Sequence, residues 1–199
     1  MSGPDSKDIF SPPPVEIPPS IERNILDMRK IFRALNFEEH WKNPEGKKVL
    51  VAGCGWTAYE IDAIFSQQSH GEVVLLDSYA SDPASLRRRH FPKLKFSFIP
   101  KSLYSYFTED PLEQFNLITF IRIPDLGYQL TETHIGGDLL EEITKRLRSN
   151  GLFVMTGNIQ KRAIPNHPQL TLLKQASLSN LSSGYLFGNH RGFLFKKKR

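Results

Sequence analysis

Two glycines and an aspartate are the residues of this chain whose spacing points most directly to chemistry. Gly53 and Gly55 flank Cys54, directly after the short apolar run 48–52 and before a segment with a helical pattern. Such a turn lets backbone amides and a helix N-terminus approach a polar ligand group. Asp77 closes the next apolar run, 22 residues after Gly55, where a carboxylate can accept hydrogen bonds from both hydroxyls of a ribose. The pattern predicts a nucleotide-type cofactor site.

The turn alone leaves several interpretations open. Residues 53–58 read G-C-G-W-T-A, which satisfies the G-x-G-x-x-G/A fingerprint of nicotinamide dinucleotide sites. S-adenosylmethionine is the second cofactor that fits such a turn. In a purely structural interpretation, Asp77 begins a turn and Gly53 allows tight packing. We interpret Cys54 as a small turn residue rather than a nucleophile, because the sequence places no histidine beside it.

The elements that position these residues alternate between strand and helix patterns. This alternation predicts right-handed crossovers and a doubly wound, mostly parallel sheet with helices on both faces. The last quarter predicts two strands without a helix between them, which form an antiparallel hairpin. Asn150-Gly151 is expected to end the longest of these helices. Strands are expected at 48–52, 73–76, 96–99, 115–121, 152–155, 170–173 and 192–195, and helices at about 58–67, 83–90 and 138–148.

Three segments are expected along the chain. Residues 1–19 form a flexible, proline-rich tail, because proline fixes φ and lacks an amide donor. Residues 20–45 form an N-terminal helical cap that begins at the good N-cap Ser20. We expect this cap to pack at the edge or mouth of the domain and to form part of a lid. Residues 46–199 form the Rossmann-like cofactor-binding domain.

Composition and charge exclude several classes of protein. The chain has 199 residues, 39% of them hydrophobic, and its single cysteine excludes an internal disulfide and a cysteine-cluster metal site. It has neither the ~20 consecutive apolar residues of a membrane span nor an apolar secretory signal. A cytoplasmic location is the simplest expectation. The net charge of +5 comes largely from the runs 87–89 and 196–199. We interpret these as a solvated helix face and a frayed tail, so a nucleic-acid partner is possible but not favoured.

Several segments together resemble one known family. Residues 49–57 read V-L-V-A-G-C-G-W-T and resemble motif I, V-L-D-L-G-C-G-T-G, of the Rossmann-like (class I) S-adenosylmethionine-dependent methyltransferases. The stretch F-N-L-I at 115–118 resembles the F-D-L-I of the fourth strand in that family. Residues 139–155 are similar to its long helix and L-K-P-G-G loop, and the family's sheet also ends in an antiparallel hairpin. The resemblance spans about residues 47–197.

The resemblance implies a cofactor, S-adenosylmethionine, and a set of residues around it. Trp56 would lie at the lip of the pocket, where it either stacks on the ligand or covers the helix. Departures from the family pattern are Val51 and Asn116 in place of acids, Thr57 in place of the third glycine, and Lys101-Ser102 where an acid often meets the adenine amine. These losses imply weak cofactor affinity or a pocket that has drifted from catalysis. The implied cofactor-binding residues are Gly53, Cys54, Gly55, Trp56, Asp77, Ser78, Ser102 and Arg122.

The loop after the fourth strand supplies the candidates for catalysis. Asp125 is placed to orient or deprotonate a methyl acceptor, or simply to start a turn. His134 precedes the long helix and either reaches the same mouth or lies on the surface. Arg122 either binds an anionic acceptor or pairs with a helix acid. Neither an Asn-Pro-Pro-Tyr motif nor a cysteine pair is present, so the expected acceptor is a small molecule or a protein. A catalytically inactive binding module and an NAD(P)-dependent oxidoreductase are the alternatives, although an oxidoreductase would normally need a further catalytic domain.

Overall fold

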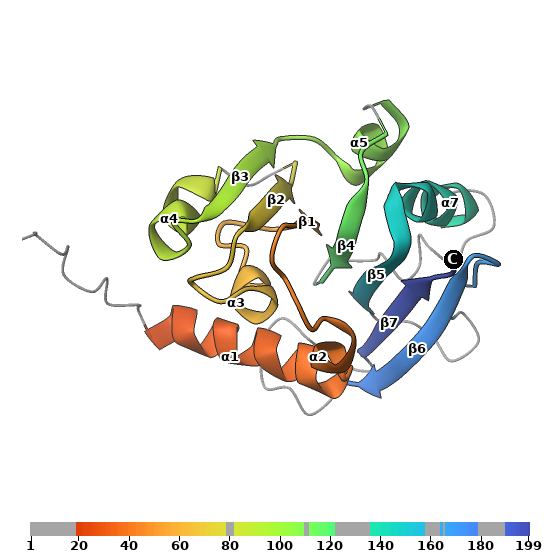
Figure 1. Ribbon diagram of the computed structural model, residues 1–199, viewed down its shortest axis with the longest axis horizontal. Coiled ribbons are helices and arrows are strands. Elements are labelled where there is room, and N and C mark those ends of the chain that lie inside the picture. The colour runs from red at the N-terminus through yellow and green to blue at the C-terminus, as the bar shows by residue number, and fades with distance from the viewer. Residues whose placement is uncertain are drawn as a thin grey trace, which may run out of the picture.

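A single sheet of seven strands runs through the molecule in the order β3-β2-β1-β4-β5-β7-β6 (Figure 1). The computed structural model describes residues 19–78, 82–109, 112–121, 136–157, 164, 166–178 and 190–199. The strands are β1 (Lys47–Ala52), β2 (Gly71–Leu76), β3 (Leu94–Ile99), β4 (Phe115–Phe120), β5 (Leu147–Gly157), β6 (Leu170–Ser177) and β7 (Arg191–Lys197).

The strand order reverses between β1 and β4. Strands β1 to β5 pair in parallel, with β2 on one side of β1 and β4 on the other. β7 pairs antiparallel with both β5 and β6. The predicted doubly wound sheet with a C-terminal antiparallel hairpin is therefore confirmed. The reversal creates a switch point at the carboxyl ends of β1 and β4, where ligands bind in open sheets of this kind.

Helices cover both faces of the sheet. Alternate residues of β1 enter two separate cores, because successive side chains of a strand point to opposite faces. Val49 and Val51 lie in the core beneath the first group of helices, and Leu50 and Ala52 lie in the core beneath the second. The first group is α1 (Pro19–Ala34), α2 (Phe37–His40), α3 (Ile61–Ile64) and α4 (Ala84–His90), and the second is α5 (Leu103–Glu109) and α7 (Gly136–Arg146).

An N-terminal helix is present, but it begins at Pro19, so Ser20 lies inside the helix rather than at its N-cap. The helix also packs differently from the prediction. Met28 and Phe32 of α1, and Leu35 directly after it, are buried in the same core as two side chains of β1. The helix therefore covers a face of the sheet, whereas we expected it at the edge or mouth. Its role as part of a lid stays a prediction.

The helix after β1 is much shorter than the expected 58–67. α3 covers Ile61–Ile64, because Ala58 has a positive φ of 44° and Phe65 is already extended. Arg87 of the basic run 87–89 is a second departure, since its side chain is buried rather than part of a solvated helix face. The burial of Arg87 goes with its contact to the Thr57 carbonyl, just after the glycine turn.

The helix α5 has no counterpart in the sequence prediction. It begins directly after Ser102, whose hydroxyl oxygen accepts a hydrogen bond from the Ser105 amide at 3.1 Å. Tyr106 and Phe107 are buried against the second core. Ser102, assigned from the sequence to the cofactor, thus acts as the N-cap of α5.

The boundary between α7 and β5 also differs from the prediction. α7 ends at Arg146, and β5 begins at once with Leu147, so the prediction that Asn150-Gly151 ends the helix is wrong. Asn150 has a φ of 62°, and the register with β4 shifts between Phe115 and Leu117. Asn150-Gly151 therefore belongs to an irregular stretch inside the strand, because pairing with Phe115 extends β5 back to Leu147.

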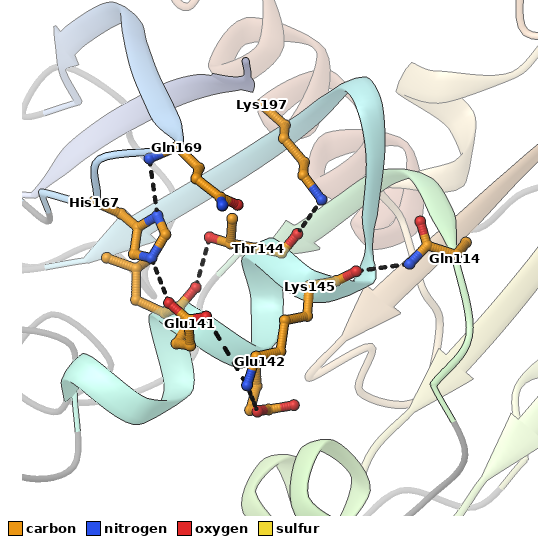
Figure 2. Close-up of polar contacts among 9 residues, drawn as sticks. Gln114, Glu141, Glu142, Thr144, Lys145, His167, Gln169 and Lys197 are labelled. Atoms are coloured by element: carbon orange, nitrogen blue, oxygen red, sulfur yellow. Dashed lines mark hydrogen bonds and ion pairs between the residues drawn. The ribbon is translucent and has the colours of Figure 1, made fainter. Parts of the chain in front are cut away.

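Side chains from other elements cap the end of α7 (Figure 2). The Lys197 ammonium donates to the carbonyls of Thr144 and Leu147 at 2.8 and 2.7 Å, and the Gln114 amide donates to the Lys145 carbonyl at 2.6 Å. His167, just before β6, lies 2.7 Å from a Glu141 oxygen. The prediction of a frayed C-terminal tail is wrong, because β7 extends to Lys197 and that residue holds the helix.

Candidate functional site

The glycine turn leaves β1 at the carboxyl edge of the sheet. The amides of Gly53 and Cys54 both donate to the Leu76 carbonyl, at 2.8 and 3.3 Å, so the turn is tied to the end of β2. Gly53 and Gly55 have φ angles of 67° and 56°, a region that side-chain-bearing residues rarely adopt. The two glycines are therefore required by the backbone path of the turn.

Asp77 and Gly55 meet directly across this edge. The Gly55 amide donates to a carboxylate oxygen of Asp77 at 2.9 Å. Asp77 is half-buried, and a Cβ built on Gly55 would meet no atom within 4 Å. The turn thus presents open space beside a carboxylate, which is the arrangement that a ribose-containing ligand needs.

Cys54 is buried in this turn, with 5% of its surface exposed. Burial raises the pKa of its thiol, and the nearby carboxylates of Asp77 and Glu60 raise it further. A thiol that stays protonated is a poor nucleophile. The interpretation of Cys54 as a small turn residue agrees with this environment.

Trp56 projects from the turn into solvent. Its exposed fraction of 69% means that the ring is not packed over the following helix. Of the two roles considered for Trp56, stacking on a ligand stays a prediction. Ser78, which follows Asp77, is also exposed at this edge.

Two departures from the methyltransferase pattern have different structural meanings. Val51 is fully buried in the first core, so a contact from this position to a ligand amine is absent. Asn116 lies in the amino half of β4, where its side-chain oxygen accepts a hydrogen bond from the Lys48 amide at 2.9 Å. Asn116 therefore joins two strands far from the carboxyl edge, and its identity does not weaken the candidate site.

Three predicted residues, Arg122, Asp125 and His134, lie outside the described residues. Arg87 is a residue that the sequence reasoning missed, although it contacts the turn. Its side chain is 3% exposed, and its Nε donates to the Thr57 carbonyl. Helical spacing from the buried Ala84 and Phe91 places positions 87 and 88 equally near the inner face, so the sequence carried no signal that singled out Arg87.

A groove of about 600 Å³ is lined by α1, by Asp62 of α3 and by the segments that directly follow α3 and α4. Its lining includes Phe65 and Ser66 before β2, and Phe91 before β3. Because these segments lead into the strands, the groove belongs to the amino edge of the sheet. It is distinct from the glycine turn at the carboxyl edge.

Solved structures with the same architecture include several methyltransferases, although each is less than 20% identical in sequence. The N-methyltransferase NodS from Bradyrhizobium japonicum WM9 is 13% identical, with a TM-score of 0.58, 92% of this chain covered and 99% of NodS. The chain has the fold of the Rossmann-like methyltransferases. Magnesium protoporphyrin IX methyltransferase from Synechocystis PCC 6803, solved with bound S-adenosylmethionine, is 10% identical, with a TM-score of 0.56 and coverages of 92% and 86%. TrmN from Thermus thermophilus is 17% identical, with a TM-score of 0.56, and the match covers 85% of this chain and 48% of TrmN.

No family model and no curated protein matches the sequence. NodS has also been solved in complex with S-adenosylhomocysteine. Among the described residues, no helix combines the length and the apolar character needed to cross a membrane.

Proposed function

We propose that this chain binds S-adenosylmethionine at the glycine turn and transfers its methyl group to an acceptor molecule. The observation that carries the proposal is the hydrogen bond of 2.9 Å between the Gly55 amide and Asp77, at the switch point of a methyltransferase-type sheet. The open space beside Gly55 leaves room for a ribose against the Asp77 carboxylate. Bound S-adenosylmethionine would supply an electrophilic methyl group.

The part of the site that is described here binds and orients rather than moves protons. Asp77 and the backbone of the turn fix the ribose end of the ligand, and precise positioning is the main requirement of an in-line displacement. The buried, protonated Cys54 thiol takes no part as a nucleophile. Asp125 and His134 stay our candidates for contacting the acceptor.

We further propose that the acceptor is a small molecule or a protein side chain. The two basic runs that could contact nucleic acid are partly engaged in contacts within the fold. Arg87 is buried against the glycine turn, and Lys197 caps α7. Fewer cations therefore remain for phosphate contacts than the sequence alone suggested.

A catalytically inactive binding module is the second candidate. Val51 favours it, because this fully buried side chain replaces the acid that usually holds the methionine amine in the family. An NAD(P)-dependent oxidoreductase is the weaker alternative, since the same turn satisfies its fingerprint.

Calorimetry and thermal shift with S-adenosylhomocysteine, NAD and NADP test these candidates. We expect S-adenosylhomocysteine alone to bind, with Asp77→Ala weakening it at least tenfold, because the carboxylate contact to the ribose is lost. Glu72→Ala is the matched control, since Glu72 lies near the start of β2, at the opposite edge of the sheet from Asp77, which follows that strand. Silence from all three nucleotides would leave the binding module, and a response to NAD or NADP alone would favour an oxidoreductase.

A further inference from the structure

Arg87 connects α4 to the glycine turn and to α3 at the same time. Its Nε donates to the Thr57 carbonyl, two residues after Gly55. Its Nη1 lies 2.7 Å from an Asp62 carboxylate oxygen, and its guanidinium stands 5.7 Å from the centre of the Tyr59 ring. One side chain thus contacts the turn, the segment that follows it and the first residues of α3.

The chemistry of arginine suits this position. A planar guanidinium holds two acceptors in a fixed relative geometry, whereas a lysine ammonium acts as a flexible point charge. Asp62 is itself largely buried, so desolvation raises its pKa while the adjacent Arg87 charge opposes that rise. Removing either partner would therefore leave the other charge buried and unpaired.

The segment that Arg87 holds is one that needs support. Gly55 and Ala58 flank Thr57, and both adopt positive φ, which for Ala58 is a strained conformation. A strained backbone conformation persists only where contacts from surrounding residues hold it in place. The Arg87 contact to Thr57 lies between these two residues and is partly buried.

We propose that Arg87, paired with Asp62, is a positioning residue that fixes residues 55–58 so that the Gly55 amide and Asp77 keep their mutual geometry for the ligand. The inference rests on the proposed function for the identity of that ligand. Its structural part, the hold on the turn, is independent of any ligand.

Hydrogen exchange of the turn amides tests that structural part. In Arg87→Lys the ammonium can keep the charge of the Asp62 pair but cannot hold both acceptors. We expect exchange at the Gly55 and Ala58 amides, which are hydrogen-bonded in the turn, to rise at least tenfold relative to the amides of β4, which report global opening. The double variant Arg87→Met/Asp62→Leu removes both buried charges and is expected to loosen the turn as well. Unchanged turn exchange in both variants would overturn the proposal.

Arg146 provides a matched control on the other face of the sheet. It is 1% exposed, and its Nη2 donates to the Tyr106 and Phe107 carbonyls at the end of α5. Arg146→Lys should lower thermal stability without loosening the turn.

Affinity for S-adenosylhomocysteine then separates positioning from a merely structural role. We expect about tenfold weaker binding in Arg87→Lys and unchanged binding in Arg146→Lys. A loosened turn with unchanged affinity would reduce Arg87 to a structural residue and overturn the proposal. Failure of the unaltered protein to bind S-adenosylhomocysteine would instead reject the proposed function, while the exchange data still decide whether Arg87 holds the turn.

Discussion

At the scale of single residues, the buried thiol of Cys54 makes stability depend on alkaline pH. Its pKa is raised in the folded state, so the folded protein keeps a proton that the unfolded chain releases above about pH 8.5. Stability is therefore lost as the pH rises. Between pH 7 and 10 we expect the unaltered protein to lose about 2 kcal/mol more of its free energy of unfolding than Cys54→Ala loses. Urea unfolding at each pH measures it, and parallel curves for the two proteins would contradict the raised pKa.

Neighbouring residues could be predicted from the sequence where the path of the backbone alone brings them together. The carboxyl ends of neighbouring parallel strands must meet, so Gly55 and Asp77 could be placed together from their spacing. The surroundings of Arg87, Ser102 and Asn116 could not be predicted in this way. Each is defined by a partner from another element: the Thr57 carbonyl for Arg87, the start of α5 for Ser102, and the Lys48 amide for Asn116.

At the scale of elements, the end of α7 depends on Lys197 of β7. The last carbonyls of a helix have no partner within it, and Lys197 satisfies that of Thr144 and the neighbouring Leu147 carbonyl. We expect Lys197→Met to lower the free energy of unfolding by about 1–2 kcal/mol. Lys196→Met, on the opposite face of the strand, is the control and should be nearly neutral. Equal losses in the two variants, measured by chemical denaturation, would reject the capping role.

Element prediction was accurate for the buried strands and poor at the boundaries. The runs at β1, β2 and β4 are short, apolar and followed by turn residues, so sequence pattern and burial agree. Residues 147–148 continue a helical pattern in the sequence, yet pairing between Leu147 and Phe115 makes them strand. Such a boundary is decided by tertiary pairing, which outweighs local propensity.

At the scale of the whole molecule, the two cores share one sheet. Each central strand contributes alternate side chains to both cores, so neither group of helices can separate without exposing the strands. The segment predicted as an N-terminal cap contributes Met28, Phe32 and Leu35 to the first of these cores. The candidate site lies at the edge of this shared sheet, so its geometry depends on both layers.

This arrangement predicts that residues 20–45 and the rest of the sheet domain unfold together. Phe32→Ala removes a buried ring from α1 and should cost about 3–5 kcal/mol, whereas Arg33→Ala on the exposed face should cost under about 0.5 kcal/mol. Replacing Trp56 by phenylalanine leaves Trp41 as the single tryptophan of the chain. Trp41 stacks on Phe37 beyond α1, so its fluorescence then reports on the unfolding of this segment. Its fluorescence and the far-ultraviolet circular dichroism should show one midpoint in denaturant, before and after Phe32→Ala. A fluorescence transition at lower denaturant would instead mean that residues 20–45 unfold as a separate unit, because the α1 contacts would then break while the sheet persists.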